Sequence, residues 1–110
     1  MNLTGQQPSQ KPQRAKPNPA YLAKVRELPC CACQKSAPSE AHHCRDLPNH
    51  DQRHLYDRLP GASLKSSDRD SIPLCSDCHR MFHLDRSKFH LLYGRDYDNI
   101  AATRRKVDCT

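Results

Sequence analysis

The chain has 110 residues, of which 35% are hydrophobic and none is Trp, and its formal net charge is +6. This length fits one small domain, and the low apolar content excludes a large hydrophobic core, so we expect a bound metal to stabilise the fold. The basic charge favours a polyanionic partner such as nucleic acid. No apolar stretch reaches the length that spans a membrane, so we expect no membrane partner.

The N-terminal residues differ in composition from the rest of the chain. Residues 1–19 are rich in Gln, Pro, Lys and Asn, which predicts a disordered basic arm before a folded domain of residues 20–110. Residues 1–29 hold five Lys or Arg against one Glu, so most of the net charge lies there. A solvated tail that only aids solubility is the alternative interpretation.

Short elements follow in chain order. Periodicity and stop signals predict a helix over residues 20–28, strands over 40–45 and 70–74, and helices over 76–82, 85–93 and 97–107. Asp85 is the expected N-cap and Gly94 the expected stop of the fifth of these elements. In the last helix we expect Ile100 and Val107 inward and Arg104, Arg105 and Lys106 outward. The connection 46–67 has no clear period, and long irregular loops tend to be functional.

Two cysteine pairs carry the strongest chemical signal. Cys30-x-x-Cys33 and Cys75-x-x-Cys78 together offer four thiolates, the natural ligands of one tetrahedral structural Zn²⁺. Two unrelated pairs of reduced cysteines are the alternative. The remaining cysteines, Cys31, Cys44 and Cys109, are expected to be free thiols. The odd count of seven and the lack of an apolar signal region favour a reducing cytoplasm.

Histidines gather around these cysteines. His79 and His83 are four residues apart on one predicted helix face, so both imidazoles can bind one cation, although such a pair is often incidental. His42 and His43 are neighbours on a predicted strand and therefore point to opposite faces. If His42 joins the cation, His43 is free to act as a general base. The alternative is that one of these two is buried for structural reasons.

The order Cys-x-x-Cys, Ala-His-His, Pro-Leu-Cys-x-x-Cys-His and a further His resembles the HNH (ββα-metal) endonucleases that carry a four-cysteine zinc. The resemblance covers residues 29–83. The segments Glu-Ala-His-His, Lys65-x-x-Asp68 and Ile72-Pro-Leu-Cys75 are similar to small phage and prophage HNH proteins, including recombination-enhancement nucleases that depend on the RecA recombinase.

The resemblance implies a small α+β protein with a zinc-stapled ββα-metal fold and flanking helices. It implies that His43 is the general base and that His42, His79 and His83 bind a catalytic divalent cation. In the family this cation is commonly Mg²⁺ or Mn²⁺, whereas three imidazoles suit a transition metal. Asp70 stands near the position where the family has an Asn that pins the loop between the strands. Asp accepts hydrogen bonds but does not donate as an amide does, so it would pin the loop differently or change the metal preference.

The sequence therefore predicts a metal-dependent DNA endonuclease of a bacterial or phage-encoded cytoplasmic system, with a recombinase filament as a further candidate partner. Basic side chains that flank the site are candidate phosphate contacts, with ordinary surface charge as the alternative: Arg45, Arg53, Arg58, Lys65 and Arg69. The other function that we consider is a non-catalytic zinc module that binds DNA or protein. Convergence of His42, His43 and His79 in space discriminates between the two.

Overall fold

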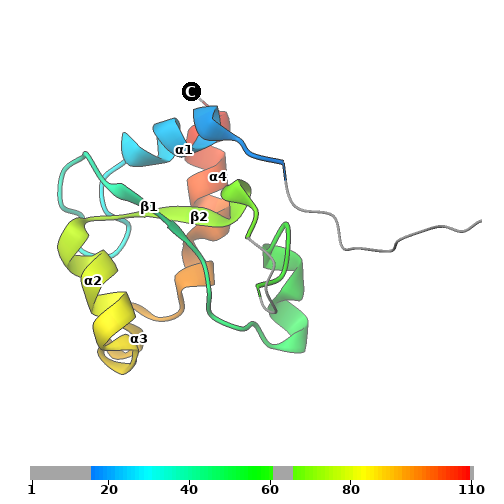
Figure 1. Cartoon of the computed structure of the whole chain (residues 1–110). Coiled ribbons are helices and arrows are strands. Elements are labelled where there is room, and N and C mark those ends of the chain that lie inside the picture. The colour runs from blue at the N-terminus through cyan, green and yellow to red at the C-terminus, as the bar shows by residue number, and fades with distance from the viewer. Residues whose placement is uncertain (1–15, 61–65, 110) are drawn as a thin grey trace, which may run out of the picture.

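The protein is a small α+β structure with one two-stranded sheet, as the sequence predicts at this coarse level (Figure 1). The computed structural model describes residues 16–60 and 66–109. Its helices are α1 (Pro19–Arg26), α2 (Ser76–Leu84), α3 (Arg86–Tyr93) and α4 (Ile100–Asp108), and its strands are β1 (Glu40–His43) and β2 (Ser71–Leu74). Three 3₁₀ helices join them, η1 (His50–Leu55), η2 (Asp68–Asp70) and η3 (Asp96–Asn99).

The antiparallel strands separate two small apolar clusters. In Figure 1, α1 lies above the strands, α2 and α3 lie below them, and α4 runs behind β2. Tyr21, Val25 and Val107 form the smaller cluster between α1 and α4, whereas Phe82 and Phe89 belong to the larger one. In the strand register His42 is opposite Ile72, and His43 is opposite Ser71. Because side chains alternate along a strand, the two histidines point to different faces of the sheet.

The helix ends follow local signals. The side chain of Asp85 accepts a hydrogen bond from the backbone N–H of Lys88 at the start of α3. Gly94 ends that helix with φ of +81°, a conformation that favours glycine. The expected N-cap and stop of this helix are therefore confirmed. Helix α2 begins directly after Cys75, so Cys78 and His79 lie in its first turn or just after it and His83 lies in its last turn.

Several local expectations differ from the structure, and the last helix begins at Ile100 rather than at residue 97 because η3 precedes it. Helix α1 begins at Pro19, one residue early, because the Asn18 side chain caps it by accepting from the backbone N–H of Tyr21. The connection 46–67 contains η1, whose three-residue turns escape a search for the 3.6-residue period. The expectation that Arg104 points outward is wrong, since this half-buried side chain binds the carboxylate of Asp70.

Among the described residues, none of the helices has the length and apolar character that a membrane span requires. Residues 1–15, most of the predicted basic arm, lie outside the described residues, as does Lys65.

Candidate metal centre and histidine site

The four cysteines of the two pairs come together at the start of α2. The sulfur atoms of Cys30, Cys33, Cys75 and Cys78 all lie within 4.8 Å of one another. Those of Cys33 and Cys75 are 3.6 Å apart. Zinc bound tetrahedrally at about 2.3 Å from each sulfur requires sulfur–sulfur distances of roughly 3.8 Å. The cluster is therefore at metal-binding distance and is consistent with a structural Zn²⁺.

Each cysteine pair forms a turn that directs backbone N–H groups at sulfur. The N–H of Cys33 donates to Cys30 Sγ, and that of Cys78 donates to Cys75 Sγ, both at 3.4 Å. Burial acts to raise the pKa of the Cys30 thiol, but backbone N–H donors outweigh burial and lower this pKa to about 7. Thiolate is the form that binds metal, so these turns suit a metal ligand.

The other cysteines lie outside this cluster. Burial raises the pKa of the Cys31 thiol to about 12, and it raises the pKa of the fully buried Cys44 well above its ordinary value. Cys109 is exposed near the C-terminus. The spacing therefore identified the four clustered cysteines, and Cys31 is not one of them.

Three histidines form a second cluster. One nitrogen each of His42, His79 and His83 lies within 4.8 Å of the others. Strand β1 supplies His42, which is 1% exposed, and helix α2 supplies His79 and the exposed His83. Burial lowers the pKa of both His42 and His83, which favours the neutral imidazole that metals bind. These three histidines could therefore hold a metal ion, and His83 is the member exposed to solvent.

A carboxylate lies within hydrogen-bond distance of one ring nitrogen in two of these histidines. His42 Nε2 lies 2.9 Å from Asp96 Oδ2, and His79 Nδ1 lies 2.7 Å from Glu40 Oε1. Each ring has one further nitrogen, which could bind a metal ion. Histidines that bind metals usually donate their other N–H to a carboxylate or carbonyl, so both pairs match the surroundings of a metal site.

His43 lies on the other face of the sheet and does not belong to this cluster, so the expected convergence of His42, His43 and His79 is met by His42 and His79 but not by His43. Its Nε2 is 2.8 Å from Asp68 Oδ1, and the His43 side chain is 31% exposed. Asp68 is buried, and its other oxygen accepts the backbone N–H of Asn18 at 2.7 Å. A carboxylate that accepts from Nε2–H leaves Nδ1 of His43 with the free lone pair. Asp68 thus holds the His43 ring in one orientation.

Asp70 fastens the long connection to the start of β2. Its fully buried carboxylate accepts the backbone N–H groups of Asp57 at 2.7 Å and Arg58 at 2.9 Å. Arg104 from α4 donates to the same carboxylate. Three donors converge on Asp70, so a side chain that only accepts hydrogen bonds fits this position better than an amide would.

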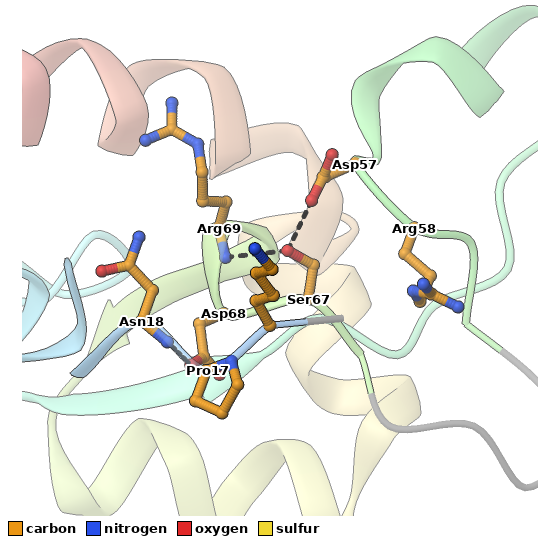
Figure 2. Close-up of a pocket in the computed structure, with 8 residues that line it drawn as sticks. Pro17, Asn18, Asp57, Arg58, Ser67, Asp68 and Arg69 are labelled. Atoms are coloured by element: carbon orange, nitrogen blue, oxygen red, sulfur yellow. Dashed lines mark hydrogen bonds between the residues drawn. The ribbon is translucent and has the colours of Figure 1, made fainter. Parts of the chain in front are cut away.

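The basic residues proposed as phosphate contacts do not lie together: some line one cleft and others lie outside it. Arg58 lines a cleft of about 440 Å³ beside Asp68, together with Lys16 (Figure 2). Arg69 also lines this cleft, but its guanidinium binds Asp108 and lies over the Tyr21 ring. Arg45 and Arg53 are exposed outside this cleft.

The acidic residues that contact the histidines were not predicted from the sequence. Asp96 contacts His42 from a position 54 residues further along the chain, and Asp46 binds His90. The segment Lys65-x-x-Asp68 was part of the resemblance, but the contact between Asp68 and His43 was not predicted. Carboxylates carry no local pattern that indicates a distant partner, so only the folded arrangement reveals these pairs.

Comparison with known proteins places the chain in one family. The family model described as "Protein of unknown function (DUF968)" matches residues 6–106, so the chain belongs to this family. No curated protein and no solved structure matches it.

Proposed function

We propose that this member of the DUF968 family is a metal-dependent endonuclease that hydrolyses phosphodiester bonds in DNA on an HNH (ββα-metal) fold. One observation carries the proposal. His42, His79 and His83 converge within 4.8 Å, and the next residue after His42 is an oriented imidazole, His43. A non-catalytic zinc module needs only the cysteines, so it would have no use for this second arrangement.

The three clustered histidines would hold the catalytic cation. When bound, a divalent cation supplies positive charge that stabilises the phosphate and the leaving oxygen during hydrolysis. Three imidazoles suit a transition metal, whereas the resemblance to HNH proteins favours Mg²⁺ or Mn²⁺. The four cysteines would hold the separate structural Zn²⁺.

His43 would act as the general base. Its Nε2–H donates to Asp68, so Nδ1 takes a proton from the attacking water. Asp68 then stabilises the imidazolium that forms, and its own buried position keeps the ring in one orientation. The bond between Asp68 and the N–H of Asn18 fixes the carboxylate to the start of α1.

DNA would bind through cations near this pair, the exposed Lys16 and the half-buried Arg58. Lys16 and Arg58 line the cleft whose wall includes Asp68, the residue that contacts His43. A phosphate held by these two side chains lies beside the proposed base. A recombinase partner and a bacterial or phage-encoded cytoplasmic setting rest on the family resemblance alone.

The test compares cleavage of plasmid and single-stranded DNA by the wild type and three variants, across Mg²⁺, Mn²⁺, Co²⁺ and Zn²⁺. His43→Ala should lower the cleavage rate about 10²–10⁴-fold, and added metal should not restore it. His79→Ala should also lower the rate, but excess metal should restore part of it because the cation site is only weakened. His54→Ala is the matched control, since His54 is exposed on η1, and it should cut at the wild-type rate.

Two results would contradict this assignment. The base and ligand roles are wrong if His43→Ala cuts as fast as wild type, or if both variants respond equally to metal. If the wild type cuts no DNA with any of these metals, the non-catalytic zinc module that binds DNA or protein becomes the better interpretation.

A further inference from the structure

A buried carboxylate from the C-terminal part of the chain holds the central histidine. Asp96 opens η3, and its side chain is fully buried. Its Oδ2 lies 2.9 Å from His42 Nε2 and 2.7 Å from the backbone nitrogen of Arg45. Its Oδ1 lies 3.3 Å from the backbone nitrogen of Asp46. Asp96 therefore accepts hydrogen bonds from the histidine and from the chain that follows β1.

Asp46 completes this arrangement from the other side. Its Oδ2 accepts the backbone N–H of Asp96 at 2.9 Å and contacts His90 Nε2 at 2.9 Å. Arg86 lies 3.8 Å from its Oδ1. Asp46 and Asp96 thus each accept the other's backbone N–H, and we call this pair the carboxylate clamp. The clamp joins the end of β1 to η3, which lies fifty residues further along the chain.

We propose that Asp96 is a positioning residue that holds His42 in the Nε2–H tautomer and so keeps Nδ1 available as a cation ligand. The inference rests on the proposed cation at His42, His79 and His83. An ionised carboxylate has no proton to donate, so the His42 nitrogen that faces it must carry the hydrogen. The ring packs edge-on against Phe82 with centroids 4.5 Å apart and is 1% exposed, so it has no alternative position in solvent.

Glu40 provides an internal comparison. It contacts His79 at 2.7 Å, but its side chain is 54% exposed, whereas Asp96 is fully buried. Water can replace Glu40 at the His79 ring but cannot reach the His42 ring in the same way. Loss of the Asp96 charge should therefore affect the cation site more than loss of the Glu40 charge.

The experiment uses the full chain with zinc in its cysteine cluster. Long-range ¹⁵N–¹H NMR, recorded before a second metal is added, identifies the tautomer of His42, and Co²⁺ titration by calorimetry measures affinity at the histidines. We expect the Nε2–H tautomer in wild type, a mixture of tautomers in Asp96→Asn, and a Co²⁺ affinity about 10–100-fold lower in that variant. Glu40→Gln should lose less affinity than Asp96→Asn.

Asp46→Asn separates positioning from general stability. It weakens the same clamp at His90 and at the Asp96 backbone, without a direct contact to His42. This variant should unfold at lower denaturant concentration, yet keep the His42 tautomer and the Co²⁺ affinity close to wild type. Equal losses of affinity in Asp46→Asn and Asp96→Asn would show a merely structural role and would overturn the inference.

The remaining outcomes are also decisive. An Nδ1–H tautomer in the wild type, no Co²⁺ binding at the histidines, or a folded Asp96→Asn protein with unchanged affinity would each overturn the role of Asp96. If Asp96→Asn does not fold, the wild-type tautomer decides. If Co²⁺ binding depends on Asp96 but no metal supports DNA cleavage, the positioning role stands and the proposed nuclease function fails.

Discussion

Removal of metal from the cysteine cluster should unfold the domain. The cluster links Cys33 and Cys75, which are 42 residues apart in the chain. A cross-link that closes a loop of this length removes unfolded-state entropy worth about 4 kcal/mol. Structural zinc sites in small peptides contribute about 10–16 kcal/mol in total, whereas whole domains are stable by only about 5–15 kcal/mol. The metal therefore accounts for most or all of the expected stability.

The packing of this protein strengthens that expectation. Cys30, Cys75 and Cys78 are themselves members of the larger apolar cluster, beside Phe82 and Leu74. Without metal, four thiols would meet at one point and lose the bonds that hold the first cysteine pair against α2. We expect a strong chelator to collapse the dispersion of the amide NMR spectrum as zinc is released, with zinc measured by a metallochromic dye.

Two cysteine variants provide the control. Cys33 and Cys109 are both exposed, but only Cys33 belongs to the cluster. Cys33→Ser should therefore release zinc and destabilise the fold, while Cys109→Ser should match wild type in both measurements. A well-dispersed spectrum retained by fully metal-free wild type would refute this reasoning.

The other predictions concern charges outside the metal sites. Arg104→Met should lower the unfolding free energy by about 3 kcal/mol in urea denaturation, because it leaves the buried Asp70 carboxylate without its cation. A loss near zero would show that the backbone N–H donors alone stabilise this carboxylate. Asp108→Asn should barely move the denaturation midpoint, since its pair with Arg69 is exposed. The Arg69 guanidinium lowers the pKa of Asp108, so the small contribution of this pair to folding stability is present at neutral pH and is lost as acid protonates the carboxyl. The variant should therefore differ in stability from wild type only at pH values where the Asp108 carboxyl is ionised. Deletion of residues 1–15 removes Lys11 and Arg14, so the slope of log affinity for DNA against log salt should fall by about two, and an unchanged slope would exclude the arm as an electrostatic anchor.

Much of the local structure could be predicted because it depends on near neighbours. The helix of residues 86–93 follows from the Asp85 cap and the Gly94 stop, both of which act within one turn. The cysteine turns likewise depend on three-residue spacing. The start of α1 was predicted less well, since the cap formed by Asn18 was overlooked.

The sequence by itself determined the members of the cysteine cluster and the separation of His42 from His43, because residue type, short spacing and strand alternation decide both. Only the tertiary structure decided which carboxylate meets which histidine. The chain has twelve Asp and Glu residues, and each could pair with any imidazole in the unfolded chain. Burial selects Asp96 for His42 and Asp68 for His43, since inside the fold a carboxylate must find donors among the groups that packing brings beside it.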